Sequence, residues 1–303
     1  GVIDSSDLPL NVSREILQDS KTVEAIRSGT VKKILSSLED MAKKKPDDYE
    51  KFWSEFGRVL KEGPAEDFTN REKIAGLLRF STTNDDSDKQ SASFDDYIGR
   101  MKPEQEAIYY ITADSFLAAK NSPHLEIFKK KNIEVLLLGD RVDEWLISNL
   151  TEYKNKKFQS IAKGDLDLGK LEDESEKGEK KKIEEKAKTL IEKIKTSLGD
   201  KVKDVKVTHR LTDSPACLVV GEHDISGNLE RILKAAGQNT PDNKPILEIN
   251  PEHKLIEKLR KFEGTSDFDE YTSVIFDQAM LSEGGQLDDP VDFVKKINRF
   301  LVK

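Results

Sequence analysis

The sequence predicts a helix-rich chain of mixed α/β and α+β class, divided into two successive domains. Apolar residues at helical spacing fill both ends of the chain, a strand–helix–strand order occupies 108–138, and a run of Lys, Glu and Asp follows it. With 303 residues the chain is long enough for two apolar cores. We therefore expect one domain at 1–164, a charged linker at 165–182 and a second domain at 183–303.

Helices dominate the first third of the chain. Residues 22–44 carry apolar side chains at intervals of three and four, and this helix ends before Pro46. A second helix places aromatic residues on one side and ends at Gly63-Pro64. Two pairs of residues each have the spacing of a capping box at the start of a short helix: Thr69 with Glu72, and Ser93 with Asp96.

A small βαβ unit follows. Residues 108–112 and 133–138 are apolar, strand-like runs, and Ser122-Pro123 between them opens a helix with proline at its first position. This order of elements indicates a parallel strand pair. Asp140 then caps a helix that carries Trp145.

The second domain mixes strands and helices. The charged run passes into a helix that ends at Gly199, and the residues at 205–207 and 217–220 predict two strands. Three later helices begin at recognisable start signals: Asn250-Pro251, Ser266 and Asp289-Pro290.

The composition is that of an acidic, highly solvated protein. Charged residues make up 36% of the chain and the net charge is −8, which argues against non-specific binding to nucleic acid. No apolar stretch approaches the ~20 residues of a membrane span, and no signal peptide is visible. The single cysteine, Cys217, lies in an apolar run and fits a buried thiol in a reducing cytoplasm.

The segment at 8–18 holds the first candidate site. Ser13 can cap a helix whose first turn then carries Arg14 and Gln18 on one face. A guanidinium and an amide at a helix start can grip a phosphate oxygen. The chemistry alone equally allows an Arg14 that only caps or pairs locally.

The same segment resembles the catalytic loop in the middle segment of the ninety-kilodalton heat-shock chaperones, the Hsp90 family. Further strings resemble that family in the same order along the chain: residues 59–68, 77–80, 108–115, 122–126, 133–138, 143–145, 207–213 and 250–253. The chain lacks the acidic tail of the eukaryotic cytosolic members, which favours the bacterial form.

This resemblance implies a molecular chaperone that assists protein folding in an ATP-driven cycle. It implies that Arg14 reaches the γ-phosphate of ATP held by another domain, with Gln18 and Asn11 supporting the loop. The sequence contains no Gly-rich phosphate loop. We therefore expect the later part of the middle segment plus a C-terminal dimerisation domain, with no enzymatic activity and no cofactor of its own. ATP and Mg²⁺ are expected only for the full-length parent.

The resemblance also implies two surfaces for unfolded or partly folded client proteins. One is Trp145, which could instead pack its own small domain. The other is a helical apolar stripe within 225–236, flanked by glycines and consisting of Ile225, Leu229, Ile232 and Leu233. Such a stripe is usually core, but in the family it belongs to a loosely held amphipathic helix.

The last two helices are the candidate dimer interface. Apolar residues at intervals of three and four on consecutive helices suit a four-helix bundle between two protomers, although both helices could also fold onto their own domain. The residues predicted at the seam are Ile275, Ala279, Phe293, Ile297 and Leu301. The expected partners are thus a second copy and client proteins, and the family also allows co-chaperones.

Two other functions compete with this hypothesis. A structural dimerisation scaffold would bury both Trp145 and the stripe within 225–236. A free-standing hydrolase built on Arg14 has no phosphate loop to support it. The four histidines are scattered and lack metal-ligand spacing, so we expect no metal site.

Overall fold

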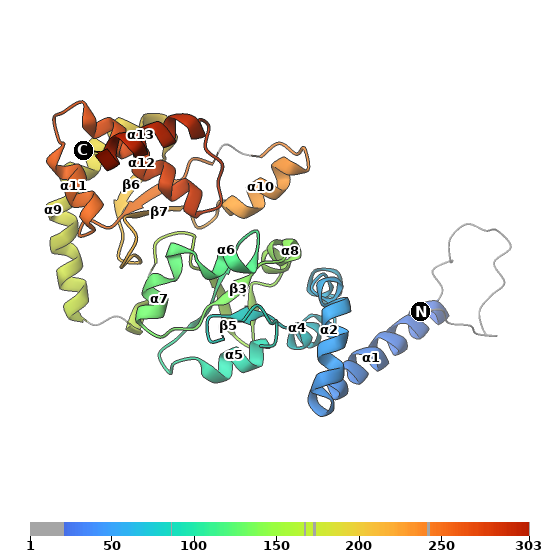
Figure 1. Cartoon of the computed structure of the whole chain (residues 1–303). Helices are drawn as coiled ribbons and strands as arrows, with labels where there is room; N and C mark the ends of the chain where they lie inside the picture. The colour runs from blue at the N-terminus through green and yellow to red at the C-terminus, as the bar shows by residue number, and fades with distance from the viewer. Residues whose placement is uncertain (1–20, 86, 167, 172–173, 241–242, 303) are drawn as a thin grey trace. The chain divides into compact units, whose positions relative to one another are not determined.

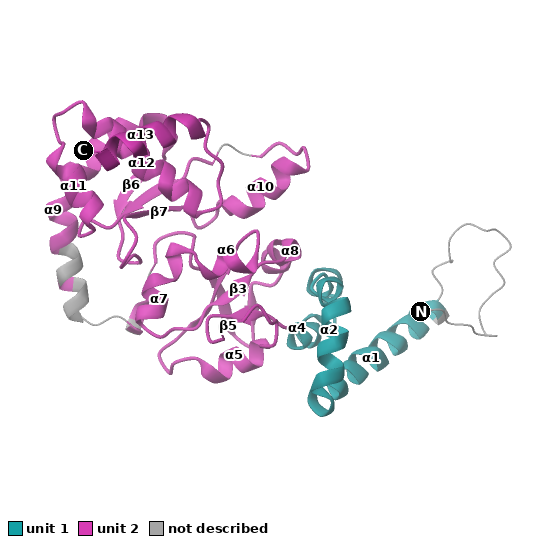
Figure 2. Cartoon of the chain, viewed as in Figure 1, with its two compact units in different colours: residues 1–78 teal, residues 79–303 magenta. Residues whose placement is uncertain are grey.

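The chain forms two compact units, residues 1–78 and residues 79–303 (Figure 2). We call them unit 1 and unit 2. The helix-rich mixed class predicted from the sequence is confirmed, with two small sheets among the helices. The computed structural model describes residues 21–85, 87–166, 168–171, 174–240 and 243–302.

Unit 1 is helical in its described part. Its elements are α1 (Lys21–Lys44), α2 (Pro46–Leu60), α3 (Gly63–Glu66) and α4 (Arg71–Leu77). The two long helices agree with the prediction, and Pro46 occupies the first turn of α2, where its missing N–H costs nothing. The core brings Leu35 and Leu38 of α1 against Tyr49 of α2 and Ile74 of α4.

One prediction in unit 1 is confirmed and another is wrong. Helix α2 ends at Leu60, just before Gly63-Pro64, as predicted, and Gly63-Pro64 itself begins the short helix α3, because proline is well suited to a first helical turn. Thr69 does not cap α4: the N-cap position is Asn70. Asp67 accepts hydrogen bonds from the backbone N–H and the side-chain amide of Asn70, at 3.0 and 2.7 Å, and this turn replaces the predicted capping box.

Unit 2 begins with a five-stranded sheet in the order β1-β3-β2-β5-β4. Strands β3 and β5 of this sheet are labelled in Figure 1. The strands are β1 (Ser81–Thr82), β2 (Ala107–Thr112), β3 (Leu136–Leu138), β4 (Glu152–Tyr153) and β5 (Lys156–Ser160). The predicted parallel pair is confirmed, since Ile111 pairs with Leu137 in register. Ile111 and its neighbours on β2 are almost wholly buried, as befits a central strand covered on both faces.

Four helices accompany this sheet: α5 (Phe94–Arg100), α6 (Phe116–Lys120), α7 (Glu126–Lys130) and α8 (Arg141–Asn149). The capping box of Ser93 and Asp96 is confirmed at the start of α5. A 3-10 turn at Pro123–Leu125 leads into α7, and the Ser122 hydroxyl accepts the N–H of His124, as the Ser-Pro signal predicts.

A second, three-stranded sheet has the order β6-β8-β7. Its strands are β6 (Asp204–Val207), β7 (Ala216–Val219) and β8 (Ile246–Ile249), with β6 parallel and β7 antiparallel to the central β8. Its helices are α9 (Glu174–Leu198), α10 (Gly227–Ala235), α11 (Lys254–Lys261), α12 (Asp267–Ser282) and α13 (Pro290–Val302). Cys217 of β7 is buried, as predicted.

The two compact units meet between residues 78 and 79. The expected boundary at 164 falls inside unit 2, which contains both sheets, so the predicted division into two domains stays a prediction. Helix α9 begins at Glu174, inside the expected linker at 165–182. Strands β1 and β4 of the first sheet were not predicted, since each is two residues long.

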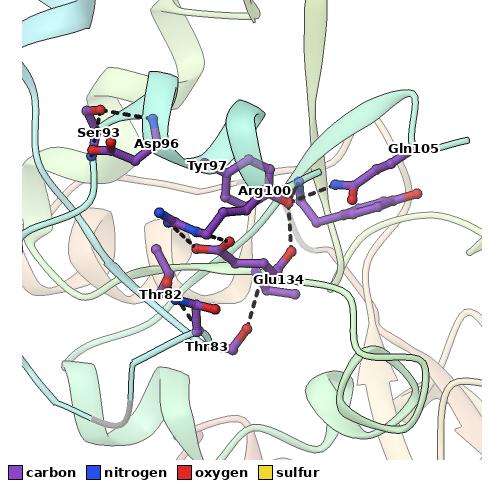
Figure 3. Close-up of polar contacts among 11 residues, drawn as sticks. Thr82, Thr83, Ser93, Asp96, Tyr97, Arg100, Gln105 and Glu134 are labelled. Carbon is purple, nitrogen blue, oxygen red and sulfur yellow. Dashed lines mark hydrogen bonds and ion pairs between the residues drawn. The ribbon is translucent and has the colours of Figure 1, made fainter. Parts of the chain in front are cut away.

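A polar network fixes α5 against the first sheet (Figure 3). The Tyr97 hydroxyl donates to the Glu134 carbonyl at 2.6 Å and accepts from the Tyr109 N–H and the Gln105 amide, both at 3.0 Å. Arg100 forms two hydrogen bonds with the Glu134 carboxylate, at 2.9 and 2.7 Å. Burial raises the pKa of Tyr97, so this phenol stays protonated and serves structure.

Replacing Tyr97 with Phe should lower the free energy of unfolding by about 1–3 kcal/mol, because buried polar groups lose their hydrogen-bond partner. Urea denaturation with an unchanged m-value would measure this loss. The matched control is Tyr271→Phe, because the buried Tyr271 hydroxyl has no hydrogen-bond partner among the described residues. Equal losses of stability in both variants would show that the hydrogen bonds of Tyr97 contribute no more than a buried hydroxyl group without partners.

Candidate functional site

The predicted catalytic residues Arg14, Gln18 and Asn11 lie outside the described residues. Across the described ranges, no group of three or more His, Cys, Asp and Glu side chains could hold a metal ion. In the same part of the chain, no helix combines the length and the apolar character needed to cross a membrane.

Trp145 lies on α8 with 56% of its surface exposed. The start of that helix is held by hydrogen bonds: the Asp140 N–H donates to Asp143 Oδ2 at 2.9 Å, and the Gln90 amide donates to Asp140 Oδ2 at 2.8 Å. The next residue, Leu146, is fully buried. One side of α8 is thus anchored, and the indole of Trp145 remains available to another molecule.

The neighbouring Glu144 is buried and connects α8 to α10. Its Oε1 atom accepts hydrogen bonds from the Ser226 hydroxyl at 2.7 Å and from the Asn228 amide at 3.0 Å. Ser226 also caps α10 by accepting the Leu229 N–H at 2.9 Å. Glu144 could not be recognised from the sequence, because a glutamate among other acidic residues at a helix start is typical of a solvent-exposed surface.

The predicted stripe lies on and just before α10. Its four members, Ile225, Leu229, Ile232 and Leu233, are each partly exposed, and none is buried. The helix ends at Ala235, and Gly237, directly after the C-cap Ala236, has a φ of +72°, which suits glycine just beyond a helix C-terminus. Helix α10 therefore presents apolar side chains at a surface instead of closing a core with them.

A groove of about 1320 Å³ lies beside α10. Its lining includes Ile232 and Arg231 of α10, Thr112 at the end of β2, and the turn that follows α12. The Arg231 guanidinium pairs with Asp114 at 3.1 Å. Lys163 also lines the groove, donates to the Asp224 carbonyl at 2.8 Å, and has its pKa lowered by burial. The groove is thus bordered by apolar and charged side chains together.

Two residues predicted at the dimer seam lie in the core of their own chain. Ile275 and Ala279 of α12 are only 4% and 2% exposed. They pack in one apolar cluster with residues of α9 and of the second sheet. Within the single chain, these two side chains leave almost no surface for a second protomer.

Helix α13 presents an apolar face to solvent. Phe293 and Ile297 are partly buried, whereas Leu301 is 79% exposed, and the sequence analysis missed three further exposed residues: Val291, Val294 and Val302. The opposite side of α13 is attached to α12, where Phe300 stacks on Tyr271 with ring centroids 3.6 Å apart. Arg299 also donates to Glu270 Oε2 at 2.6 Å. One face of this helix packs on α12 of the same chain, and the other face leaves apolar side chains in contact with solvent.

Comparison with known proteins agrees with the resemblance along the whole chain. The family model described as "Hsp90 protein" matches residues 1–303. The chain is 63% identical over 302 residues to the chaperone protein HtpG of Dechloromonas aromatica, with 100% of this chain and 47% of that protein covered. It is 61% identical over 307 residues to HtpG of Nitrosomonas europaea and 60% identical over 306 residues to HtpG of Nitrosospira multiformis, covering 48% of each.

The chain thus spans about half the length of the curated relatives it matches. Within that half, the similarity extends over the strings quoted from both sheets and from the segment at 8–18. The chain belongs to the Hsp90 family.

Proposed function

We propose that this chain supplies client binding and dimerisation to a molecular chaperone. The observation that carries the proposal is the joint exposure of Trp145 and the α10 stripe within one compact unit. A dimerisation scaffold without client contact is the second candidate. It would have no need to leave both of these apolar features accessible.

The client surface combines a rigid part and an amphipathic part. Trp145 is an aromatic anchor on a helix whose other side is buried, and such anchors contribute most of the energy of many interfaces. The α10 stripe offers aliphatic side chains that unfolded polypeptides can contact without a defined sequence. Hydrogen bonds from Ser226 and Asn228 to Glu144 keep the two parts together.

Changing Leu229, Ile232 and Leu233 together to Ser should weaken the suppression of client aggregation several-fold, because the apolar contact area is lost. Light scattering from a chemically unfolded reporter enzyme would measure it. The matched control changes three exposed apolar residues elsewhere, Ile34, Val59 and Leu255, to Ser. A fall of many degrees in Tm for the α10 variant would show that the stripe belongs to the core. An unchanged scattering curve would show that clients bind elsewhere.

We further propose that a second copy of the chain covers α13. Val291, Val294 and Leu301 recur at intervals of three and seven and share the exposed side of the helix. The other side is already packed on α12 through Phe300 and Tyr271. A two-fold arrangement would place two copies of α12 and α13 in a four-helix bundle, which is how such stripes are buried in helical dimers.

Changing Val294 and Leu301 to Asp should convert the dimer into a folded monomer. Burial of such side chains contributes roughly 1.5–3 kcal/mol each, so two buried charges per protomer outweigh the association energy. Light scattering at micromolar concentration would measure the mass, and circular dichroism would check the fold. The control is the pair Ile275→Val and Ala279→Ser, which alters the protomer core and should leave the mass unchanged. An Asp variant that remains a dimer would show that the interface lies elsewhere.

The ATP-driven part of the cycle also remains a proposal. We infer that Arg14, supported by Gln18 and Asn11, acts on ATP and Mg²⁺ bound by a part of the protein beyond these 303 residues. Co-chaperone partners and a cytoplasmic location are further expectations from the family.

In the full-length protein, Arg14→Ala should lower kcat for ATP hydrolysis at least ten-fold and leave nucleotide affinity nearly unchanged, because the contact forms mainly in the transition state. The 303-residue chain alone should hydrolyse ATP only at the background rate. A coupled phosphate-release assay measures both. An Arg14-dependent turnover by the chain alone would contradict this division of labour.

A further inference from the structure

Unit 2 consists of two layers, each with its own apolar cluster. The first layer carries β1–β5, and its cluster includes Tyr109, Leu125 and Phe128. The second layer carries β6–β8, and its cluster includes Leu247 and Ile275. Among the described residues, these two clusters share no member. Hydrogen bonds and ion pairs join the layers, and a small third cluster of Leu211, Cys217 and Val219 lies in the second layer.

The first of these contacts is made by Glu126, at the start of α7. Its Oε2 atom accepts three consecutive backbone N–H groups of the second layer: Thr212 at 2.5 Å, Asp213 at 2.7 Å and Ser214 at 3.2 Å. Its Oε1 atom accepts the Ser214 hydroxyl at 2.5 Å. Successive backbone N–H groups that converge in this way form a pocket for an anion, and here a carboxylate of the same chain fills it.

The pKa of Glu126 agrees with this geometry. Burial acts to raise the pKa, but the Ser214 hydroxyl and the three N–H groups outweigh it and hold the pKa below its usual value. The group is therefore ionised at neutral pH, and its hydrogen bonds are charge-assisted.

The second contact is made by Arg210, whose side chain is 1% exposed. Within its own layer, its Nε lies 2.7 Å from Glu248 Oε2 on β8. Toward the first layer, its Nη1 and Nη2 atoms donate to the carbonyls of Ile161 at 2.5 Å and Gly164 at 2.8 Å. The Arg210 carbonyl in turn accepts the Ile127 N–H at 3.1 Å. One residue thus connects both layers through its side chain and its backbone.

We propose that Glu126 and Arg210 form a polar clasp that locks the two layers of unit 2 into one body. Arg210 and the N–H groups that bind Glu126 lie within one short segment, residues 210–214. The two interactions therefore form and break together. Because the apolar clusters are separate, release of the clasp lets the layers part while each keeps its own core. The clasp thereby positions α8 in the first layer and α10 in the second.

Hydrogen exchange with residue-level mass spectrometry tests this clasp in the 303-residue chain. The main variant is Glu126→Gln, which keeps the shape of the side chain and removes its charge. We expect exchange at Thr212–Ser214 to rise at least ten-fold. We also expect a similar rise at Gly164, whose N–H donates to the Val220 carbonyl at 2.9 Å across the same seam but does not contact Glu126.

Reporter amides in each core complete the design. Ile111 in β2 and Leu247 in β8 should exchange at the wild-type rate, because the cores stay intact. The control variant is Glu257→Gln, an exposed glutamate on α11 that should alter none of these amides. A rise confined to Thr212–Ser214 would overturn the proposal, since Glu126 would then order only its own loop. A rise at both core reporters would also overturn it, since the layers would then form a single core.

Two milder variants keep the test decisive if Glu126→Gln does not fold. Ser214→Ala removes only the hydroxyl that donates to Glu126 and should give a smaller rise at the same amides. Arg210→Lys keeps the charge but loses the forked geometry of the guanidinium, so exchange at Gly164 should rise in this variant too. The matched control is Arg260→Lys on the exposed side of α11. Wild-type exchange at Gly164 in both variants would show that the layers are held by other contacts.

Discussion

A guanidinium group taken out of water needs a partner for its N–H groups, and at Arg210 this requirement shapes much of unit 2. Glu248 places a carboxylate in the interior from the central strand β8, which is acceptable only beside a cation. The chain leaving β5 must then turn its carbonyls toward the same group. An ion pair and hydrogen bonds to backbone carbonyls therefore connect the two sheets. The relative placement of α8 and α10 depends on these contacts.

Much of the fold could be predicted from the sequence because its helices follow local rules. The capping pair of Ser93 and Asp96 and the Ser122-Pro123 signal act within a few residues, so they can be read without a structure. Strand β8 escaped prediction because a four-residue run such as Ile246–Ile249 has no periodicity to distinguish it. The hairpin of β4 and β5 escaped for another reason. Its turn places Lys154 and Asn155 at positive φ, where Lys is not an expected residue.

The candidate site was predictable only in part, because exposure is a property of the whole fold. Trp145 and the α10 stripe were found through their family strings and their spacing, but spacing does not show which face of a helix is covered. The same limit applies to Ile275 and Ala279, whose helix has apolar residues on more than one side and buries these two in the core of the chain. Glu144 could not be found at all, since its hydrogen bonds to Ser226 and Asn228 join positions 82 and 84 residues apart.

The buried thiol of Cys217 has a practical consequence. Burial raises the pKa of that thiol well above its usual value, so the reactive thiolate is scarce while the second sheet is closed. Unfolding returns the group to water and to ordinary reactivity. Because Cys217 is the only cysteine of the chain, its rate of alkylation would report the opening of β7 as a single chemical signal. The chain thus contains a natural probe for the stability of the second sheet, and no engineered label is needed.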